Sequence, residues 1–195
     1  MSRTAKLALA CALAFASLQS PLRADEYTVD PSHTSVIFGI SHLGYSFTYG
    51  RFNKVSGDFT LDPAKPDAAS FTLTIDANSI DTNDAKRDDH LKAPDFLNTG
   101  EFPVISFKSN KVDVKQEGES TVYVVSGELT MHGETKPVTL NLQKLGEGPG
   151  PTGQDFRTGF NCQTKLNRSE WGMTKMIPHI GDEVAVTISF EGIRK

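Results

Sequence analysis

The sequence predicts an all-β protein, an antiparallel barrel or sandwich of about eight strands with one short helical insertion at about residues 83–98. Three observations support this prediction. Apolar and polar residues alternate in nearly every segment after residue 25, which is the pattern of strands with one buried face. Clusters of Gly, Pro, Asp and Asn separate these segments, and a single segment breaks the alternation with helix-forming residues. Many short strands of this kind favour a closed barrel or two packed sheets.

Each expected strand carries its large apolar residues on one parity, so that they share one face of the sheet. In chain order these sets are Val36, Phe38 and Ile40; Val55, Phe59 and Leu61; Phe71, Leu73 and Ile75; Ile105 and Phe107; Tyr123, Val125, Leu129 and Met131; Val138, Leu140 and Leu142; Phe160, Cys162 and Leu166; and Val184, Val186, Ile188 and Phe190. Turn signals at 62–70, 115–120, 131–137 and 146–155 separate several of them. Neither a linker nor an internal repeat divides the chain, so we expect one domain.

The segment 81–100 loses the alternation and is the one convincing helical stretch. Asn83 or Asp84 can cap a helix start, and Pro94 forces a stop near Ala93.

Residues 1–24 have the layout of a secretory signal peptide, with cleavage expected after Ala24. Arg3 and Lys6 precede an apolar run of roughly 12 residues, which is short of the ~20 that a bilayer span needs. A lipoprotein anchor at Cys11 is disfavoured, because only four apolar residues separate it from Lys6. The remaining residues, 25–195, form the expected β-barrel domain.

The domain that remains is acidic and has no disulfide. It holds 17 basic and 24 acidic side chains, a net charge of −7. Such a surface disfavours nucleic-acid binding and electrostatic docking to anionic lipid headgroups. Cys162 is its one cysteine, so the core alone must stabilise the fold.

The segment 87–98, RDDHLKAPDFLN, is dense in titratable residues but does not read as a metal or acid/base site. On a helix, His90 lies beside Lys86 and Arg87, which repel a divalent ion, while Asp88 and Asp89 point elsewhere. Its apolar residues suit a rim element lying over something hydrophobic.

Other catalytic or metal constellations are equally weak. His33 and His42 have opposite parity, so on one regular strand they cannot share an ion. Zinc spacings, a Gly-x-Ser-x-Gly elbow and phosphate-binding glycine loops do not occur in the sequence. We therefore expect no metal and no cofactor.

The most informative residues are apolar. The domain holds 11 Phe, four Tyr and one Trp, and the loop 169–178 adds Trp171, Met173, Met176 and Ile177. These residues can form an ordinary β core, or they can line an eight-stranded barrel that encloses an elongated apolar molecule, with methionines at a flexible mouth. The pattern alone leaves both open.

Four stretches of sequence resemble the YceI-like family of secreted lipid-binding proteins. They span 30–62, 79–109, 127–140 and 181–192, and include SHLGYS at 41–46 and RDDHLKAPDF at 87–96. The resemblance covers essentially the whole domain. It implies a lipocalin-like antiparallel β-barrel with a helical rim element, a periplasmic location, a pore that holds a polyisoprenoid or similar amphiphile, and no catalytic residues.

The expected function is therefore non-enzymatic binding, transport or storage of a long-chain isoprenoid, such as a polyprenyl quinone, or of another amphiphilic lipid. The alternatives are a lipid-modifying enzyme that uses His33 or His42 at the pore mouth, and an adaptor acting through the helix. We expect no nucleic-acid partner and no stable membrane anchor; ligand identity and a homodimer are left open. The predicted ligand contacts, taken from the inward parity, are Phe38, Ile40, Phe59, Phe71, Leu73, Ile75, Phe107, Leu129, Met131 and Phe160.

Overall fold

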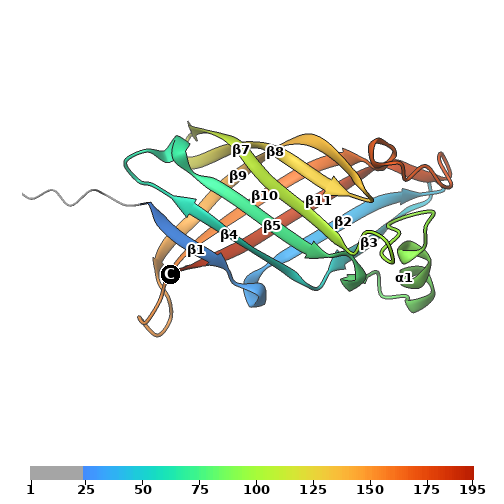
Figure 1. The fold of residues 1–195 in the computed structure, drawn as a ribbon, viewed down its shortest axis with the longest axis horizontal. Helices are drawn as coiled ribbons and strands as arrows, with labels where there is room; N and C mark the ends of the chain where they lie inside the picture. Colours follow the sequence, from blue (N-terminus) through green and yellow to red (C-terminus); the bar gives the residue numbers. More distant parts are fainter. Residues whose placement is uncertain (1–23) are drawn as a thin grey trace, which may run out of the picture.

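A computed structural model describes residues 24–195 and confirms the all-β barrel (Figure 1). The predicted signal peptide, residues 1–24, lies outside the described residues except for Ala24. The strands are β1 (Asp25–Val29), β2 (Ser35–His42), β3 (Ser46–Phe52), β4 (Val55–Leu61), β5 (Ser70–Asp76), β6 (Ile80–Asp81), β7 (Val104–Glu117), β8 (Ser120–Met131), β9 (Glu134–Pro149), β10 (Phe156–Asn167) and β11 (Ile180–Arg194).

Eight of these strands form a closed antiparallel ring. Its order is β1-β4-β5-β7-β8-β9-β10-β11, and β11 returns to β1 through the pairing of Arg194 with Tyr27. Neighbours along β7 to β11 are also neighbours in sequence, joined by hairpins or by the longer connection before β11. The alternation predicted from the sequence therefore places one face of every strand inside the barrel.

Three of the eight barrel strands are interrupted near their middle. β1 and β2 both pair with β11 but are separated by η1 (Pro31–His33), and β4 and β3 are separated by residues 53–54. β5 and β6 are separated by η3 (Ala77–Ser79). Beyond these breaks β6 pairs with β3, and residues 24–195 contain no pairing of β6 with β7. The sheet is thus a closed ring at one end, whereas at the other β6 does not pair with β7 and the pairing of β9 with β10 stops at Gln143 and Asn161 within the described chain.

The helical insertion is shorter than the predicted 83–98. The α-helix α1 spans Ala85–Lys92, and Asp84 caps it by accepting hydrogen bonds from the amides of Lys86 and Arg87. The helix stops at Ala93 because the residue before a proline avoids helical backbone. The other helices of the described chain are single 3-10 turns: η1, η2 (Pro66–Ala68), η3 and η4 (Arg168–Trp171). None of the helices within residues 24–195 has the length and apolar character that crossing a bilayer requires.

One end of the barrel, called the packed end below, is filled by a cluster of aromatic rings. Phe160 is fully buried, and its ring centroid lies 5.3 Å from that of Phe190, 5.6 Å from those of Phe71 and Tyr123, and 5.7 Å from that of Phe59. Stacked and edge-to-face pairs at these distances are favourable beyond the area that they bury. The chain terminus at Lys195 lies at this end (Figure 1).

A glycine permits the close approach of two strands near this cluster. Gly127 of β8 faces Ser109 of β7, beside a bulge between Ser109 and Lys111. A Cβ at Gly127 would collide with the carbonyl of Lys108 and, at 2.7 Å, with the ring of Phe107. Any larger residue here would push the two strands apart.

Candidate functional site

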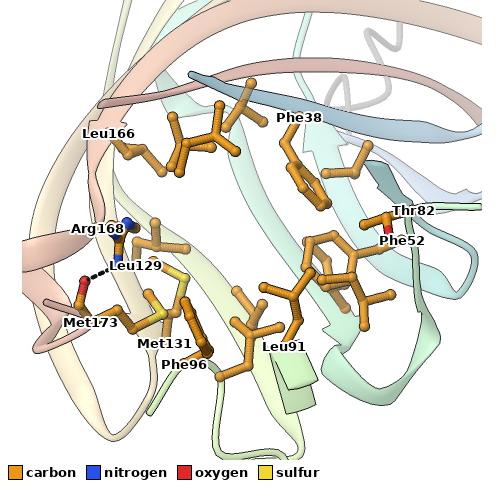
Figure 2. A pocket seen from close by; sticks show the side chains of 18 of the residues that line it. Phe38, Phe52, Thr82, Leu91, Phe96, Leu129, Met131, Leu166, Arg168 and Met173 are labelled. Carbon is orange, nitrogen blue, oxygen red and sulfur yellow. Dashed lines mark hydrogen bonds between the residues drawn. The ribbon is translucent and has the colours of Figure 1, made fainter. Parts of the chain in front are cut away.

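The opposite end of the barrel, called the cavity end, holds a cavity of about 370 Å³. This volume falls within the roughly 300–1,000 Å³ of small-molecule sites. α1 and the β2–β3 turn gather at this end, away from Lys195 (Figure 1). Figure 2 shows the space between inward-pointing side chains, nearly all of whose atoms are carbon. The apolar lining consists of Val36, Phe38, Ile40, Phe52, Val55, Leu73, Ile75, Ile80, Leu91, Phe96, Leu97, Ile105, Phe107, Leu129, Met131, Val138, Leu140, Leu166, Met173, Met176, Ile180, Val184, Val186 and Ile188.

The side chains that line this end differ from those that fill the packed end. Past the breaks, β2, β3 and β6 continue the wall, while the interior is lined mostly by aliphatic residues rather than by stacked rings. Phe38, Phe52, Phe96 and Phe107 are the aromatic exceptions, and the ring centroids of Phe38 and Phe52 lie 5.7 Å apart on one wall (Figure 2). Eight strands enclose a lumen that large side chains can fill, and at this end the smaller ones leave space for a ligand.

The segment of α1 closes the open side between β6 and β7. Leu91 lines the cavity from the helix, and Phe96 and Leu97 do so from the turn that follows it. The helix is held by Thr82, whose hydroxyl donates to Asp88 Oδ1 at 2.6 Å and accepts from Arg87 Nε at 2.8 Å. The charged residues that drew attention in the sequence thus anchor the rim element.

A second rim element, η4 and the loop 172–179, is held by a buried arginine. Arg168 donates hydrogen bonds to four backbone carbonyls, those of Met173, Lys175, Ile180 and Gly181. The bond to Met173 is visible in Figure 2. Burial lowers the pKa of the Arg168 guanidinium, and the nearby Asp182 acts in the opposite direction. Trp171, also buried, donates from its indole nitrogen to the carbonyl of Leu129 and so fixes η4 against β8.

The polar groups on the cavity wall are few and none is acidic. They are His42, Thr48, Thr82, Arg87, His90, Thr164 and Arg168. Within the described chain, no carboxylate, serine or cysteine lines the cavity. Cys162 lies in the packed end, where burial raises the pKa of its thiol. The site can enclose an apolar chain and present hydrogen-bond donors and cationic groups to an acceptor, but it lacks a nucleophile or an acid paired with a histidine.

The structure brings seven of the ten predicted contact residues onto the cavity wall. These are Phe38, Ile40, Leu73, Ile75, Phe107, Leu129 and Met131. The other three, Phe59, Phe71 and Phe160, point inward but belong to the aromatic cluster, because their strands carry them to the packed end. Leu73 lies at the boundary, since it lines the cavity and also packs in the aromatic core. As contacts with a ligand, all ten stay predictions.

Several lining residues were missed because they lie outside the strands. Leu91, Phe96, Leu97, Met173 and Met176 come from the two rim elements. The sequence did signal them as a group, since apolar residues stood on the helical segment and methionines in the loop. The roles of Arg168 and Thr82 had no such signal, because they depend on how the irregular segments that follow them fold back onto these side chains.

His33 and His42 have different environments. His42 lines the cavity, whereas His33 is on η1, outside the lining, with Nδ1 2.8 Å from Asp30 Oδ2. The ligand atoms of Asp30, His33 and Glu191 are close enough for a metal, but Arg157 already donates to Asp30 at 2.7 Å and to Glu191 at 2.9 Å. The bond with His33, together with that from Arg157, holds the pKa of Asp30 well below its usual range. We interpret this group as an ion-pair network that pins the break between β1 and β2.

This chain is similar to known proteins in both sequence and fold. The YceI-like domain family matches residues 27–192. A UPF0312 protein of Shewanella baltica is 40% identical over 194 residues, covering 97% of this chain and 100% of that relative. A UPF0312 protein of Pseudomonas paraeruginosa is 42% identical over 174 residues, 88% of each chain.

Solved structures show the same barrel. The crystal structure of Burkholderia cenocepacia BcnA superposes with a TM-score of 0.73 at 25% identity, covering 84% of this chain and 98% of that chain. A polyisoprenoid-binding domain from Saccharophagus degradans has a TM-score of 0.67 at 18% identity, covering 87% and 98% of the two chains. At that identity the likeness concerns the fold alone.

Proposed function

This chain belongs to the YceI-like family, and on that premise we propose that it binds a long-chain isoprenoid or similar amphiphilic lipid in the cavity, as a periplasmic carrier or store that leaves the lipid unchanged. The single observation that carries the proposal is the cavity of about 370 Å³, whose wall, among residues 24–195, has 24 apolar residues and no acidic one. An isoprenoid or acyl tail gains about 0.8 kcal/mol for each methylene-sized group removed from water. A few such groups offset the cost of ordering a flexible tail.

The polar end of the cavity suggests how the ligand is oriented. His42, Arg87 and His90 lie toward the rim elements, and Arg168 anchors the loop that frames the same opening. The donors of Arg168 are engaged by backbone carbonyls and two of the Arg87 nitrogens by Thr82, so His42, His90 and the remaining Arg87 nitrogen are the groups that a hydrogen-bond-accepting head would meet while the tail extends toward Leu73. A quinone, a polyprenyl phosphate and a fatty amide all meet this requirement.

A catalytic role for the cavity has weaker support. Of the two histidines considered for catalysis, His42 lies on the cavity wall. No carboxylate within residues 24–195 lines the cavity beside it. His33 is engaged by Asp30 away from the cavity. A histidine without an orienting acid or an adjacent nucleophile is a poor start for hydrolysis or isomerisation.

The periplasmic part of the proposal rests on the sequence of residues 1–24, which has the layout of a cleaved signal peptide. A carrier in that compartment would shield an apolar tail from water between the two membranes.

Native mass spectrometry of protein purified without detergent tests the proposal. We expect a fraction of the protein to carry a lipid adduct, and empty protein to take up a polyprenyl quinone or a polyprenyl alcohol. Protein that is empty as isolated and takes up neither lipid would overturn it. Adducts whose mass changes during long incubation would instead favour the enzyme.

A further inference from the structure

The rim of the cavity exposes apolar side chains that nothing in the fold requires. Tyr45 is 89% exposed, and Leu43, Phe47, Met176 and Ile177 are also exposed. We call these five residues the rim patch. Leu43, Tyr45 and Phe47 belong to the β2–β3 hairpin, and Met176 and Ile177 to the loop 172–179. Exposed large apolar residues that cluster in this way mark an interaction surface.

The two parts of the rim patch adjoin each other and the cavity. The amide of Leu43 donates to the carbonyl of His179 at 2.7 Å, which ties the hairpin tip to the loop. His42 and Met176 line the cavity itself. Along β3, Thr48 faces the cavity while Phe47 and Tyr49 face outward. A single hairpin therefore presents the ligand site on one face and the rim patch on the other.

The backbone at both tips supports a functional reason for this exposure. Leu43 has φ 53° and Met176 has φ 64°, a left-handed conformation that bulky side chains seldom adopt. Leu43 and Gly44 are the central residues of a tight turn closed by the Tyr45 amide and the His42 carbonyl. Asn-Gly is the favoured sequence for such a turn, so the stability of the turn does not explain why residue 43 is a leucine. Residues held in an unfavourable conformation cluster at functional sites.

The charge of the rim suits a lipid surface. The domain carries a net charge of −7, yet residues 41–50 and 172–181 contain no carboxylate. Lys175 is their one permanently charged side chain, and it pairs with Asp95 at 3.1 Å. These two segments are thus nearly neutral, and the other rim element, residues 84–95, offsets its four aspartates with three basic residues, so the rim meets less repulsion at anionic headgroups than the rest of the acidic surface.

We propose that the rim patch inserts reversibly into the interfacial layer of a phospholipid bilayer, with the cavity opening against the lipid. Tyrosine and phenylalanine suit that layer because they combine an apolar body with tolerance of a partly hydrated setting. A second copy of the chain is the alternative partner for the rim patch. A stable dimer, however, buries roughly 20–30 residues on each side, and the rim patch has five residues at the tips of two narrow segments. The proposal goes beyond lipid binding in the cavity and does not rest on it.

Vesicle flotation with purified protein tests the proposal. We expect binding to both phosphatidylcholine vesicles and vesicles that contain phosphatidylglycerol, with little dependence on salt, since insertion of apolar groups is weakly screened. The variant Leu43→Asn with Phe47→Thr should bind about tenfold more weakly or worse, which corresponds to about 1.4 kcal/mol of lost apolar transfer. Neither residue lines the cavity, and Asn-Gly improves the turn, so the melting temperature should not fall.

The matched control is Leu145→Asn. Leu145 is 63% exposed, on β9 toward the packed end, so the same substitution should leave vesicle binding unchanged. Equal losses in Leu43→Asn and Leu145→Asn, or wild-type protein that floats with neither vesicle, would overturn the proposal. A wild-type dimer in analytical ultracentrifugation that Leu43→Asn with Phe47→Thr makes monomeric, without vesicle binding, would overturn it in favour of a second copy. Because the readout is vesicle binding rather than occupancy of the cavity, each proposal can fail while the other stands.

Discussion

The two ends of this barrel are built from the same alternating strands but reach opposite outcomes. At the packed end the ring of eight strands is closed by hydrogen bonds, and large aromatic side chains fill the lumen. At the cavity end β2, β3 and β6 continue the wall beyond the interruptions, α1 closes one side, and the side chains leave a cavity of about 370 Å³. Under the proposed function, the fold assigns its stability to the packed end and its lipid site to the cavity end.

This division has a physical basis in what fills the lumen. Phe160 contacts four other rings, so every face of it is packed by protein. Leu166, six residues further along the same strand, is half-buried and lines the cavity. Close packing fills one end with a core, whereas at the other end apolar side chains face a cavity.

The largest effect on stability is expected from substitutions at Phe160 and Leu166, which lie at opposite ends of β10. Phe160→Ala should lower the free energy of unfolding by about 3–5 kcal/mol, because it leaves a cavity among rings that cannot relax. Leu166→Ala should cost less than about 2 kcal/mol, since its side chain already faces open space. Urea denaturation of both variants measures the difference. Equal losses would mean that the cavity end contributes to the core as much as the packed end.

The next largest effect is expected on the affinity for the ligand rather than on the stability of the fold. Ile40→Asp places a carboxylate on the cavity wall, where contact with a hydrocarbon tail deprives it of water. We expect the affinity for a polyprenyl quinone to fall by about a hundredfold or more, near 3 kcal/mol, while the protein still melts cooperatively. Ile37→Asp is the control, because Ile37 lies on the outer face of the same strand and is exposed. Unchanged affinity in Ile40→Asp would place the lipid elsewhere.

The sequence could predict which face of each strand points inward, but not where along the barrel axis a residue lies. Phe71, Leu73 and Ile75 share one parity, yet Phe71 lies in the aromatic cluster, Leu73 at the boundary and Ile75 on the cavity wall. Axial position depends on strand register and tilt, which follow from pairing between distant segments. The cap at Asp84 and the stop before Pro94 were predictable, because both are local backbone effects.

A smaller effect on stability is expected at the break between β1 and β2, where Asp30 lies. Asp30 is bonded to Arg157, and the pKa of its carboxyl lies well below the usual value near 3.9. A carboxyl with a lowered folded pKa stabilises the protein at pH above its unfolded value and loses that contribution as pH falls toward the folded one. Asp30→Asn should therefore cost about 1.5–3 kcal/mol at pH 7, a penalty that shrinks below about pH 4. Melting curves of both proteins from pH 7 to pH 3 measure this; a constant difference would show that the loss does not depend on the charge of Asp30, and coincident curves would show that Asp30 adds nothing.

The smallest effect concerns the rim element that closes the cavity end. No residue of α1 is buried, and Leu91 is its apolar residue that packs against the core, so the helix relies strongly on its cap and on Thr82. Asp84→Ala removes the acceptor for the amides of Lys86 and Arg87 and should cost the helix about 1 kcal/mol. Because regions with few buried contacts open independently of the global fold, the loss should speed hydrogen exchange across α1 by about fivefold and leave the amide of Phe160 unaffected. Hydrogen-exchange mass spectrometry resolves the two regions. If the exchange of β10 rose together with that of α1, the two ends would unfold as one unit, and the assignment of stability to the packed end alone would have to be given up.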